Sequence, residues 1–219
     1  MFWMKKAIYN TLKNIIKIYL MIFCEFRVWG KEKIISGPKI FCSNHFSSTD
    51  PFFVITLMSE PVHMIIGPGF SIPILKNILN AGEQINALEI HRSEVINSAV
   101  KYLSKGESVY IFPEGNLNNQ NELLKFYNGV AKIHIETNLP IIPIGILSPR
   151  RNVKDKKINM KIGETVFKTL TVLTGKYYAN IGEPLLFQDK DYSLNEITKI
   201  VRNKIIDLIN DIKINKFWS

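Results

Sequence analysis

The sequence contains few cysteines and no long apolar run, and both features exclude classes of protein. Only Cys24 and Cys42 are present, and their spacing fits neither a disulfide framework nor a metal-binding motif. The longest uncharged apolar run near the N-terminus, residues 18–24, is far shorter than the ~20 residues that a membrane-spanning helix needs. No small-residue cleavage site follows that run, so we expect neither a membrane span nor a signal peptide. A protein of a reducing compartment, such as the cytoplasm, is the simplest interpretation.

Linkers, low-complexity tracts and internal repeats are also absent from the sequence, and acidic residues are outnumbered by basic ones. The 219 residues are 46% hydrophobic and 21% charged, which suits one globular core. Lysine and arginine total 28 against 19 aspartates and glutamates, giving a net charge of +9. Such a chain attracts an anionic partner: nucleic acid, a phospholipid surface, or a phosphorylated or acyl-carrier substrate. Nucleic acid is disfavoured, because the sequence has no recognisable nucleic-acid-binding motif.

Residues 1–28 predict an amphipathic helix that precedes the rest of the domain. On a wheel of about 100° per residue, one face gathers polar and basic residues and the opposite face gathers apolar ones. The basic face carries Lys6, Asn10, Lys13 and Lys17, and the apolar face carries Ile8, Leu12, Ile15, Tyr19 and Ile22. Such a helix either lies in the headgroup layer of a membrane or docks on the protein core. The net charge and the aromatic tip, Phe2 and Trp3, favour the membrane.

Residues 29–219 predict a single α/β domain. Strand-like apolar runs alternate with helical stretches, and this pattern implies a mixed, largely parallel sheet flanked by helices. The runs are 39–43, 62–66, 108–112 and 140–147, and the helical stretches lie near 51–58, 73–80, 93–105 and 127–138. Later strands are expected at 166–173 and 176–187. A last helix, with apolar residues at steps of three and four from Leu194 to Ile212, is expected to pack on the core.

The segment NHFSSTD, residues 44–50, follows the first of these strands and carries a histidine and an aspartate. In an α/β sheet, functional residues collect beyond the carboxyl ends of the strands, and this segment occupies such a position. Asp50 could accept a hydrogen bond from one imidazole nitrogen of His45 and leave the other nitrogen free to take a proton. Two alternatives remain open. The pair could bind a metal, although no third ligand lies nearby, or Asp50 could simply cap a helix.

Two further stretches carry charged residues that belong to the same argument. SVYIFPEGN, residues 108–116, is a strand-like run that ends in Glu114 and Gly115, a carboxylate and a flexible backbone. LEIHRSE, residues 88–94, places Arg92 just before a helix start, where a guanidinium could hold a phosphate through paired hydrogen bonds. Taken alone, each charged residue is also compatible with an ordinary surface position.

Together and in this order, these stretches resemble the glycerolipid acyltransferase family. The family's four blocks correspond to NHFSSTD (44–50), LEIHR (88–92), FPEG (112–115) and LPIIPIGI (139–146). KFYNGVAKI (125–133) also resembles the segment that follows the third block, and the resemblance extends over about residues 30–185. It implies a glycerolipid acyltransferase-like fold. It also implies transfer of a fatty acyl group from acyl-CoA or acyl-carrier protein to the free hydroxyl of a lysophospholipid.

The resemblance further implies roles for individual residues. His45 is the base that takes the proton of the lysolipid hydroxyl, and Asp50 orients it. The expected substrate-binding residues are Asn44, Arg92, Glu114, Gly115 and Lys125. Of these, Arg92 holds the lysolipid phosphate, and Glu114 with Gly115 positions the glycerol. No metal or bound cofactor is implied, because the thioester is a cosubstrate. The expected location is the cytoplasmic face of a membrane, as a peripheral or monotopic protein.

Two departures from the family pattern concern the acceptor. Residues 116–118 read Asn-Leu-Asn where the family usually has Thr-Arg-Ser, so an arginine expected at the phosphate is missing, and Glu89 stands where the second block is usually apolar. The phosphate contact could come instead from Arg92, Lys125, or the pair Arg150 and Arg151. The acceptor is therefore 1-acyl-glycerol-3-phosphate or a lysolipid with another headgroup. A non-catalytic membrane-surface lipid-binding protein is the rival interpretation.

Overall fold

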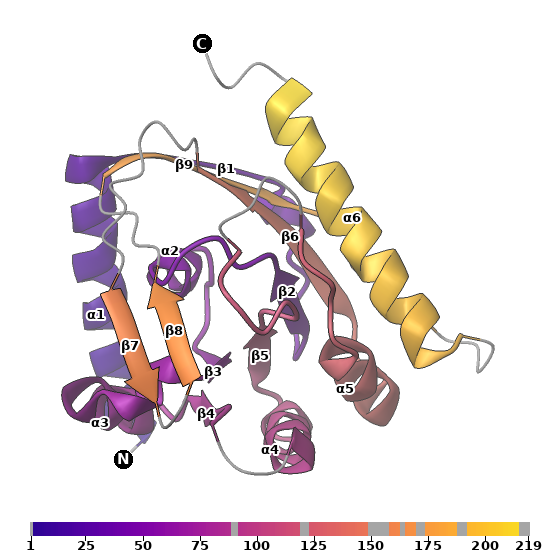
Figure 1. Cartoon of the computed structure of the whole chain (residues 1–219), viewed down its shortest axis with the longest axis horizontal. Coiled ribbons are helices and arrows are strands. Elements are labelled where there is room, and N and C mark those ends of the chain that lie inside the picture. Colours follow the sequence, from indigo (N-terminus) through magenta and orange to yellow (C-terminus); the bar gives the residue numbers. More distant parts are fainter. Residues whose placement is uncertain are drawn as a thin grey trace.

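The computed structural model describes residues 2–88, 92–118, 123–148, 158–162, 165–169, 174–187 and 192–214 (Figure 1). A seven-stranded sheet forms the centre of the molecule and has helices on both faces. The strands are β1 (Cys24–Trp29), β2 (Ile40–Ser43), β3 (Val62–Ile66), β4 (Ile85–Asn86), β5 (Ser108–Ile111), β6 (Ile141–Leu147) and β9 (Gly175–Ile181). Their order across the sheet is β1-β9-β6-β2-β5-β3-β4.

Most neighbouring strands in this sheet run parallel. β6, β2, β5, β3 and β4 form a parallel block. β9 joins β6 in antiparallel orientation, and β1 then lies parallel to β9. β7 (Ile158–Ile162) and β8 (Thr165–Thr169) form a separate antiparallel pair. The predicted fold class, a single α/β domain with a mixed, largely parallel sheet, is confirmed.

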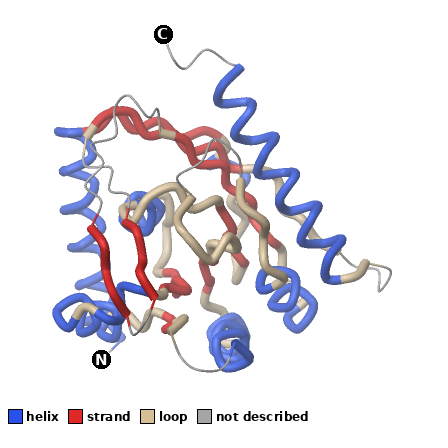
Figure 2. Tube along the Cα trace, viewed as in Figure 1, coloured by secondary structure: helices blue, strands red, loops and turns tan. Residues whose placement is uncertain are grey.

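Helices lie on both sides of the sheet and form two layers (Figure 2). Alternate side chains of the strands belong to the cores under the two layers. α4 (Arg92–Ser104), α5 (Gly129–Thr137) and α6 (Leu194–Ile214) cover one face, and α1 (Phe2–Phe23) and α2 (Asp50–Ile55) cover the other. In β2, Ile40 and Cys42 pack with the first layer, whereas Phe41 packs with the second. α3 (Pro73–Ala81) follows the short η2 turn (Pro68–Ser71) after β3. Strands buried on both faces explain why the apolar runs are nearly continuous.

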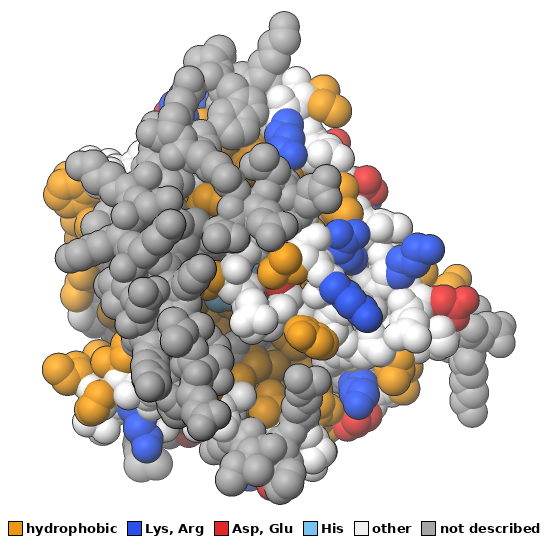
Figure 3. Space-filling model, in the orientation of Figure 1, with side chains coloured by type: hydrophobic (Ala, Val, Ile, Leu, Met, Phe, Trp, Pro, Cys, Tyr) orange, Lys and Arg blue, Asp and Glu red, His pale blue; other side chains and the backbone are white. Residues whose placement is uncertain are grey.

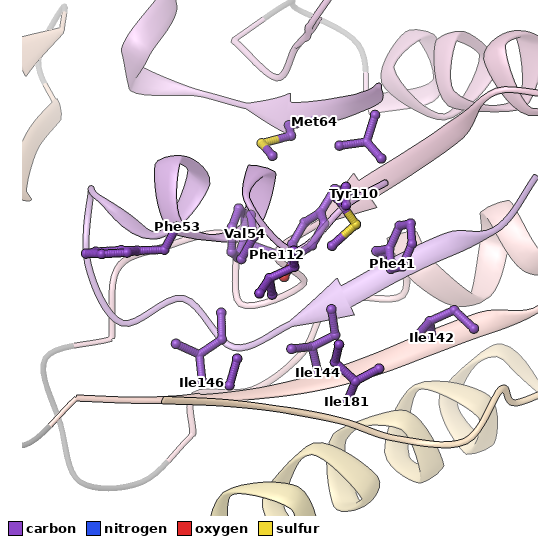
Figure 4. Packing of buried hydrophobic residues seen from close by; sticks show 14 of the residues in the cluster. Phe41, Phe53, Val54, Met64, Tyr110, Phe112, Ile142, Ile144, Ile146 and Ile181 are labelled. Atoms are coloured by element: carbon purple, nitrogen blue, oxygen red, sulfur yellow. The ribbon is translucent and has the colours of Figure 1, made fainter. Parts of the chain in front are cut away.

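The core on the α1 and α2 side is built largely from aromatic rings and isoleucines (Figure 4). Phe41 and Tyr110 stack across β2 and β5 with ring centroids 6.1 Å apart. Phe112, one residue beyond β5, belongs to the same cluster, with its ring 5.0 Å from that of Tyr110. Because Phe112 also begins the loop that carries Glu114, the packed core gives this loop a rigid base.

α6 packs on the core, as its apolar periodicity predicts. Ile197, Val201, Ile205, Leu208 and Ile212 are all buried. A Cβ at Gly145 of β6 would lie 2.8 Å from the Cβ of Leu208, so glycine at this position lets the helix approach the sheet.

The helix predicted over residues 1–28 extends too far at its C-terminal end, because residues 24–28 belong to β1. α1 ends at Phe23, and residues 24–29 pair with β9 as an edge strand of the sheet. The physical reason is a change of period: in Glu25-Phe26-Arg27-Val28 charged and apolar residues alternate, and Phe26 and Val28 pack on the core. Such an alternation of period two indicates a strand rather than a helix.

Over residues 9–23, whose side chains the structure describes, α1 docks on the domain through one side. Leu20 is buried and Ile16 packs beside it, while the Tyr9 hydroxyl donates to the carbonyl of Glu60 (3.1 Å) and the Lys13 ammonium donates to the carbonyl of Met58. A second apolar side stays exposed, through Ile15, Ile18, Met21, Ile22 and Phe23. Figure 3 shows apolar side chains at the left edge of the molecule, over α1 and α3. No helix in the described ranges is both long and apolar enough to cross a membrane.

Candidate active site

Two loops meet at the carboxyl edge of the parallel strands β2 and β5. Residues 44–49 connect β2 to α2, and residues 112–118 follow β5. Because Cys42 aligns with Ile111 in the paired strands, both loops leave the sheet side by side. The backbone N–H of Asn118 donates to the carbonyl of His45 (2.7 Å) and ties the loops together. The structure thus brings the first and third sequence blocks into contact.

His45 and Asp50 form a hydrogen-bonded pair at this edge. Nδ1 of His45 lies 3.0 Å from Oδ2 of Asp50, and the Asp50 side chain is fully buried whereas that of His45 is 18% exposed. A proton on Nδ1 that is donated to the carboxylate leaves Nε2 with its lone pair. Within the described part of the chain, Nε2 makes no hydrogen bond. The pair therefore has the form of an oriented base. The capping alternative is wrong, because Thr49 is the N-cap of α2 and the Asp50 carboxylate accepts from residues before the helix and from Tyr177.

The Asp50 carboxylate is held by further donors. Oδ2 also accepts from the backbone N–H groups of Phe46 (2.6 Å) and Ser47 (2.8 Å). Oδ1 accepts from the hydroxyls of Ser47 and Tyr177, each at 2.8 Å. A buried carboxylate without such donors would be costly, so these bonds make its burial possible and fix its orientation.

Tyr177 was not predicted as a site residue. It reaches Asp50 from β9, and its ring stacks on Phe53 of α2 with centroids 3.8 Å apart. Burial, and then the negative charge of Asp50, raises the pKa of Tyr177 well above its ordinary value, so the hydroxyl keeps its proton and donates it to the carboxylate. The residue lies in the strand predicted at 176–187, but its contact with Asp50 depends on the antiparallel pairing of β9 with β6, which no local signal indicates.

Phe112 holds the plane of the imidazole. Its ring is stacked on that of His45, with centroids 4.2 Å apart and an angle of 22° between the planes. Since Phe112 is buried in the core, the stack limits how the histidine ring can tilt. The residue belongs to the FPEG block, yet its role was not foreseen.

Glu114 lies behind His45 and joins the two loops. Its side chain is 1% exposed; Oε1 accepts the backbone N–H of His45 (2.8 Å), and Oε2 accepts that of Leu124 (2.9 Å). Burial raises the pKa of Glu114, and the hydrogen bonds from these two backbone groups oppose the rise. Because both oxygens are engaged, a direct contact with a substrate glycerol would require one of these bonds to be exchanged. Gly115 beside it has φ +64°, a conformation that glycine adopts without strain.

Asn44 is buried and bonded to the neighbouring strand. Its side-chain N–H donates to the carbonyl of Ile146 (2.9 Å), and its side-chain oxygen accepts the N–H of the same residue (2.8 Å). This pair of bonds continues the β2–β6 ladder beyond Ser43 and Ile144. The amide therefore sets the point at which the His45 loop leaves the sheet.

Most of the predicted phosphate-binding side chains lie outside the described part of the structure. Arg92 begins α4, but its side chain lies outside the described residues, as do Arg150 and Arg151. Lys125 is exposed on the segment after the FPEG loop, and no described contact connects it to His45. Leu117 is partly exposed on the FPEG loop.

The arrangement can supply a general base. An oriented imidazole with an accessible nitrogen can take a proton from a bound hydroxyl and return it to a leaving group. Among the residues that the structure describes, no group of three or more His, Cys, Asp and Glu could hold a metal ion.

Comparisons with known proteins give the family. The model of the Acyltransferase family matches residues 25–147. The chain is 23% identical over 195 residues to the 1-acyl-sn-glycerol-3-phosphate acyltransferase of Borreliella burgdorferi, covering 85% of this chain and 72% of that protein. It is 27% identical over 131 residues to a chloroplastic 1-acyl-sn-glycerol-3-phosphate acyltransferase of Arabidopsis thaliana, covering 57% of this chain and 36% of that one.

A solved structure shares the fold. The crystal structure of the 1-acyl-sn-glycerophosphate acyltransferase from Thermotoga maritima matches with a TM-score of 0.72 and 20% identity, over 95% of this chain and 82% of that one. The family model covers more than half of the chain and includes His45, Asp50 and Glu114. The chain therefore belongs to the Acyltransferase family, as the four sequence blocks predicted, and it is an O-acyltransferase.

Proposed function

We propose that this enzyme moves a fatty acyl group from acyl-CoA or acyl-carrier protein to the free hydroxyl of a lysophospholipid, with 1-acyl-glycerol-3-phosphate as the first candidate acceptor. The observation that carries the proposal is the His45–Asp50 pair, whose remaining nitrogen is accessible at the sheet edge. The names of the relatives from Borreliella burgdorferi and Arabidopsis thaliana support the acceptor class. The basic net charge suits an anionic acceptor and an acidic acyl carrier.

The proton transfers follow from the geometry of the dyad. Nε2 of His45 takes the hydroxyl proton as the acceptor oxygen attacks the thioester carbonyl. The imidazolium that forms is stabilised by Asp50 at Nδ1. When the tetrahedral intermediate collapses, the carbon–sulfur bond breaks and the thiolate takes the proton back from Nε2. No acyl-enzyme and no bound cofactor is needed. Glu114, Asn44, Phe112 and Tyr177 act by holding the dyad in place.

A direct assay tests the proposal. Purified protein is incubated with radiolabelled acyl-CoA or acyl-carrier protein and a panel of lysolipids that differ in headgroup. Formation of the diacyl product, with lysophosphatidate among the accepted substrates, is the expected result. A protein that binds lipid vesicles but acylates no member of the panel with either donor would instead support the non-catalytic alternative.

Position 117 is expected to influence the choice of acceptor. Leu117→Arg should raise activity on lysophosphatidate relative to other lysolipids by roughly tenfold or more, because a guanidinium makes charge-assisted, often bidentate bonds to a phosphomonoester. Competition assays with mixed lysolipids measure this ratio. Leu117→Gln is the control that removes the leucine without adding charge. A wild type that already prefers lysophosphatidate strongly, and is unaffected by the arginine, would show that another residue, such as Lys125, holds the phosphate.

We also propose that α1 binds the cytoplasmic face of a membrane through its exposed apolar side. Ile15 (59% exposed), Ile18 (58%) and Ile22 (66%) lie on one stripe of the helix, opposite the side that docks on the core. Lys17 flanks this stripe and is exposed to solvent. Such a helix would place the active site beside its lipid substrate.

Replacing Ile15, Ile18 and Ile22 by Ser is expected to move the protein from membranes to the soluble fraction. Each exposed isoleucine that enters the acyl boundary contributes about 1.5 to 3 kcal/mol, so losing all of them should weaken vesicle binding at least a hundredfold. The substitutions spare Leu20 and Ile16, which hold the helix on the core, whereas deleting α1 would expose that core. Sedimentation with vesicles measures the effect.

The matched control replaces exposed isoleucines elsewhere: Ile135 on α5 and Ile200 and Ile214 on α6, each to Ser. This variant should bind vesicles as the wild type does. Equal loss in both variants would mean that the membrane contact is not made by α1.

A further inference from the structure

A pocket of about 220 Å³ lies between α1, the β1 strand and the end of α2. Two lysines, Lys17 and Lys31, line this pocket. Met21, Cys24 and Phe26 also line it. Lys31 opens the η1 turn (Lys31–Lys33) directly after β1, and Gly30 in the left-handed conformation (φ +75°) makes that turn. The turn thus brings a lysine from after the strand to the same pocket as a lysine of α1.

The lysines around this pocket have no described acidic partner. Burial, and then the positive charges of Lys17 and Lys31, lowers the pKa of Lys13, so both of these lysines lie near Lys13. Glu25, the acidic residue beside Cys24, pairs with Arg27 (2.7 Å) and Lys176 (3.5 Å) instead. Within the described ranges, no carboxylate forms an ion pair with Lys17 or Lys31. A group of unpaired cations favours an anionic ligand.

Apart from Thr56, the rest of the pocket is lined by Leu20, Met21, Cys24 and Phe26, and Met21 places it beside the exposed apolar residues of α1. Met21 is 83% exposed and stands next to Ile22 and Phe23, which are also exposed. Phe26 continues the apolar wall inward, where it packs on the core. A ligand that satisfies both halves of the pocket carries a negative group and an adjoining alkyl chain.

This pocket is separate from the catalytic dyad. Phe26 lies between the pocket and Phe53, with ring centroids 6.2 Å apart, and Phe53 in turn stacks on Tyr177. The Tyr177 hydroxyl reaches Asp50 on the far side of these rings. A ligand in the pocket would therefore not occupy the position beside His45.

We propose that the pocket binds the phosphate headgroup of an anionic glycerophospholipid of the membrane, with Lys17 and Lys31 on the phosphate and the first acyl carbons against Met21 and Phe26. The proposal rests on the proposed membrane contact of α1 and deepens it. A headgroup held at this point fixes the depth and the rotation of α1 at the surface, and hence the direction in which the active site faces the lipid layer.

A soluble short-chain lipid tests the site without a membrane. The probe is monomeric dihexanoylphosphatidylglycerol, and the readout is protection of Cys24 from alkylation at alkaline pH. Cys42 is fully buried and serves as the internal reference, and Cys24→Ser defines the background. We expect the probe to protect Cys24, whereas dihexanoylphosphatidylcholine and inorganic phosphate at the same concentration protect it much less.

Lys17→Gln with Lys31→Gln should weaken protection by the probe roughly 30-fold, taking about 1 kcal/mol for each basic residue at an anionic lipid surface. The matched control, Lys199→Gln with Lys213→Gln on α6, removes the same charge from exposed positions and should leave protection unchanged. Equal weakening in both double variants would overturn the proposal, because the effect would then be one of net charge.

Two other outcomes would also overturn it: protection by inorganic phosphate as strong as by the lipid, which would indicate a simple ion site, and no protection by any probe. The assay contains no acyl donor and no vesicle. Its failure therefore leaves acyl transfer and the α1 contact to be judged by their own experiments.

Discussion

His45→Ala is expected to abolish measurable acyl transfer while leaving the protein folded. The imidazole supplies the only accessible base that the described residues place at this edge, and a positioned general base contributes about 10²- to 10⁴-fold to a rate. The structural cost should be small, because the ring is partly exposed and stacks on Phe112, and the Asp50 carboxylate keeps its four other hydrogen-bond donors when the imidazole is removed. Losing such a stack removes about 0.5 to 1.5 kcal/mol. Initial rates with the lysolipid panel and a thermal melt on the same sample measure both effects.

His134→Gln provides the matched histidine control. His134 is buried in α5, where Nδ1 lies 2.7 Å from the carbonyl of Leu139, and it has no contact with the dyad. We expect this variant to lose some stability and to keep its turnover. A folded His45→Ala protein that retains near-normal rates would rule out the proposed mechanism, whatever the control shows.

The local elements could be predicted well from the sequence. The runs at 62–66 and 140–147 correspond to β3 and to β6 within one residue, and the other two early strands differ from the structure by a similar margin. These segments are buried on both faces and bounded by polar residues, so their pattern contains little ambiguity. The helical stretch at 93–105 agrees with α4 for the same reason, because its apolar stripe faces the sheet.

The pairing of the later strands could not be predicted in the same way. Periodicity shows which side chains of β9 share a face, but it does not show that β9 runs antiparallel to β6 or that β1 pairs with it. Strand pairing is a contact between segments far apart in the chain, and it is decided by packing and connection geometry. Tyr177 was missed because of this, since its contact with Asp50 exists only once β9 takes its place in the sheet.

The site shows a related limit. The sequence blocks predict Glu114 and Asn44 as site residues, but they do not say which atoms these side chains bind. In the structure both serve backbone groups: Glu114 accepts from the amides of His45 and Leu124, and Asn44 bonds the backbone of Ile146 in both directions. Loops that leave a sheet expose backbone donors and acceptors that need partners, and buried polar side chains often supply them. A block of this kind can therefore hold a catalytic residue in place without touching the substrate.

Of the two predicted alternatives for α1, docking on the core is confirmed, and contact with a membrane stays a prediction. The helix docks on the core through Leu20 and Ile16, and it also leaves Ile18 and Ile22 exposed. Lys13, expected on the open basic face, instead bonds the carbonyl of Met58. A wheel gives the mean direction of the apolar side chains, but the line along which a helix contacts its domain depends on the shape of the surface beneath it.

Asp50→Asn is expected to slow acyl transfer by about a hundredfold or more, somewhat less than the loss in His45→Ala, while largely keeping the geometry of the loop. The hydrogen bonds explain why the geometry should survive. Oδ2 accepts from two backbone amides, which can only donate, so the asparagine oxygen should face them and can still accept from the imidazole Nδ1. Its N–H₂ group then faces the hydroxyls of Ser47 and Tyr177, which can turn and accept.

What the asparagine cannot replace is the charge. The imidazolium that forms when His45 takes a proton loses its counter-ion, so the transition state is destabilised more than the resting enzyme. Tyr177→Phe separates the effect of charge from the effect of losing a hydrogen bond, because it removes one donor and leaves the carboxylate. We expect the turnover number of this variant to fall by less than about tenfold. Such a fall is consistent with the loss of a single hydrogen bond of about 0.5 to 1.5 kcal/mol. Turnover numbers measured at saturating lysolipid, with melting temperatures for both variants, give the comparison. If Asp50→Asn turned over as fast as Tyr177→Phe, Asp50 would act only by holding the loop before α2, and the stabilisation of the imidazolium would have to come from another group.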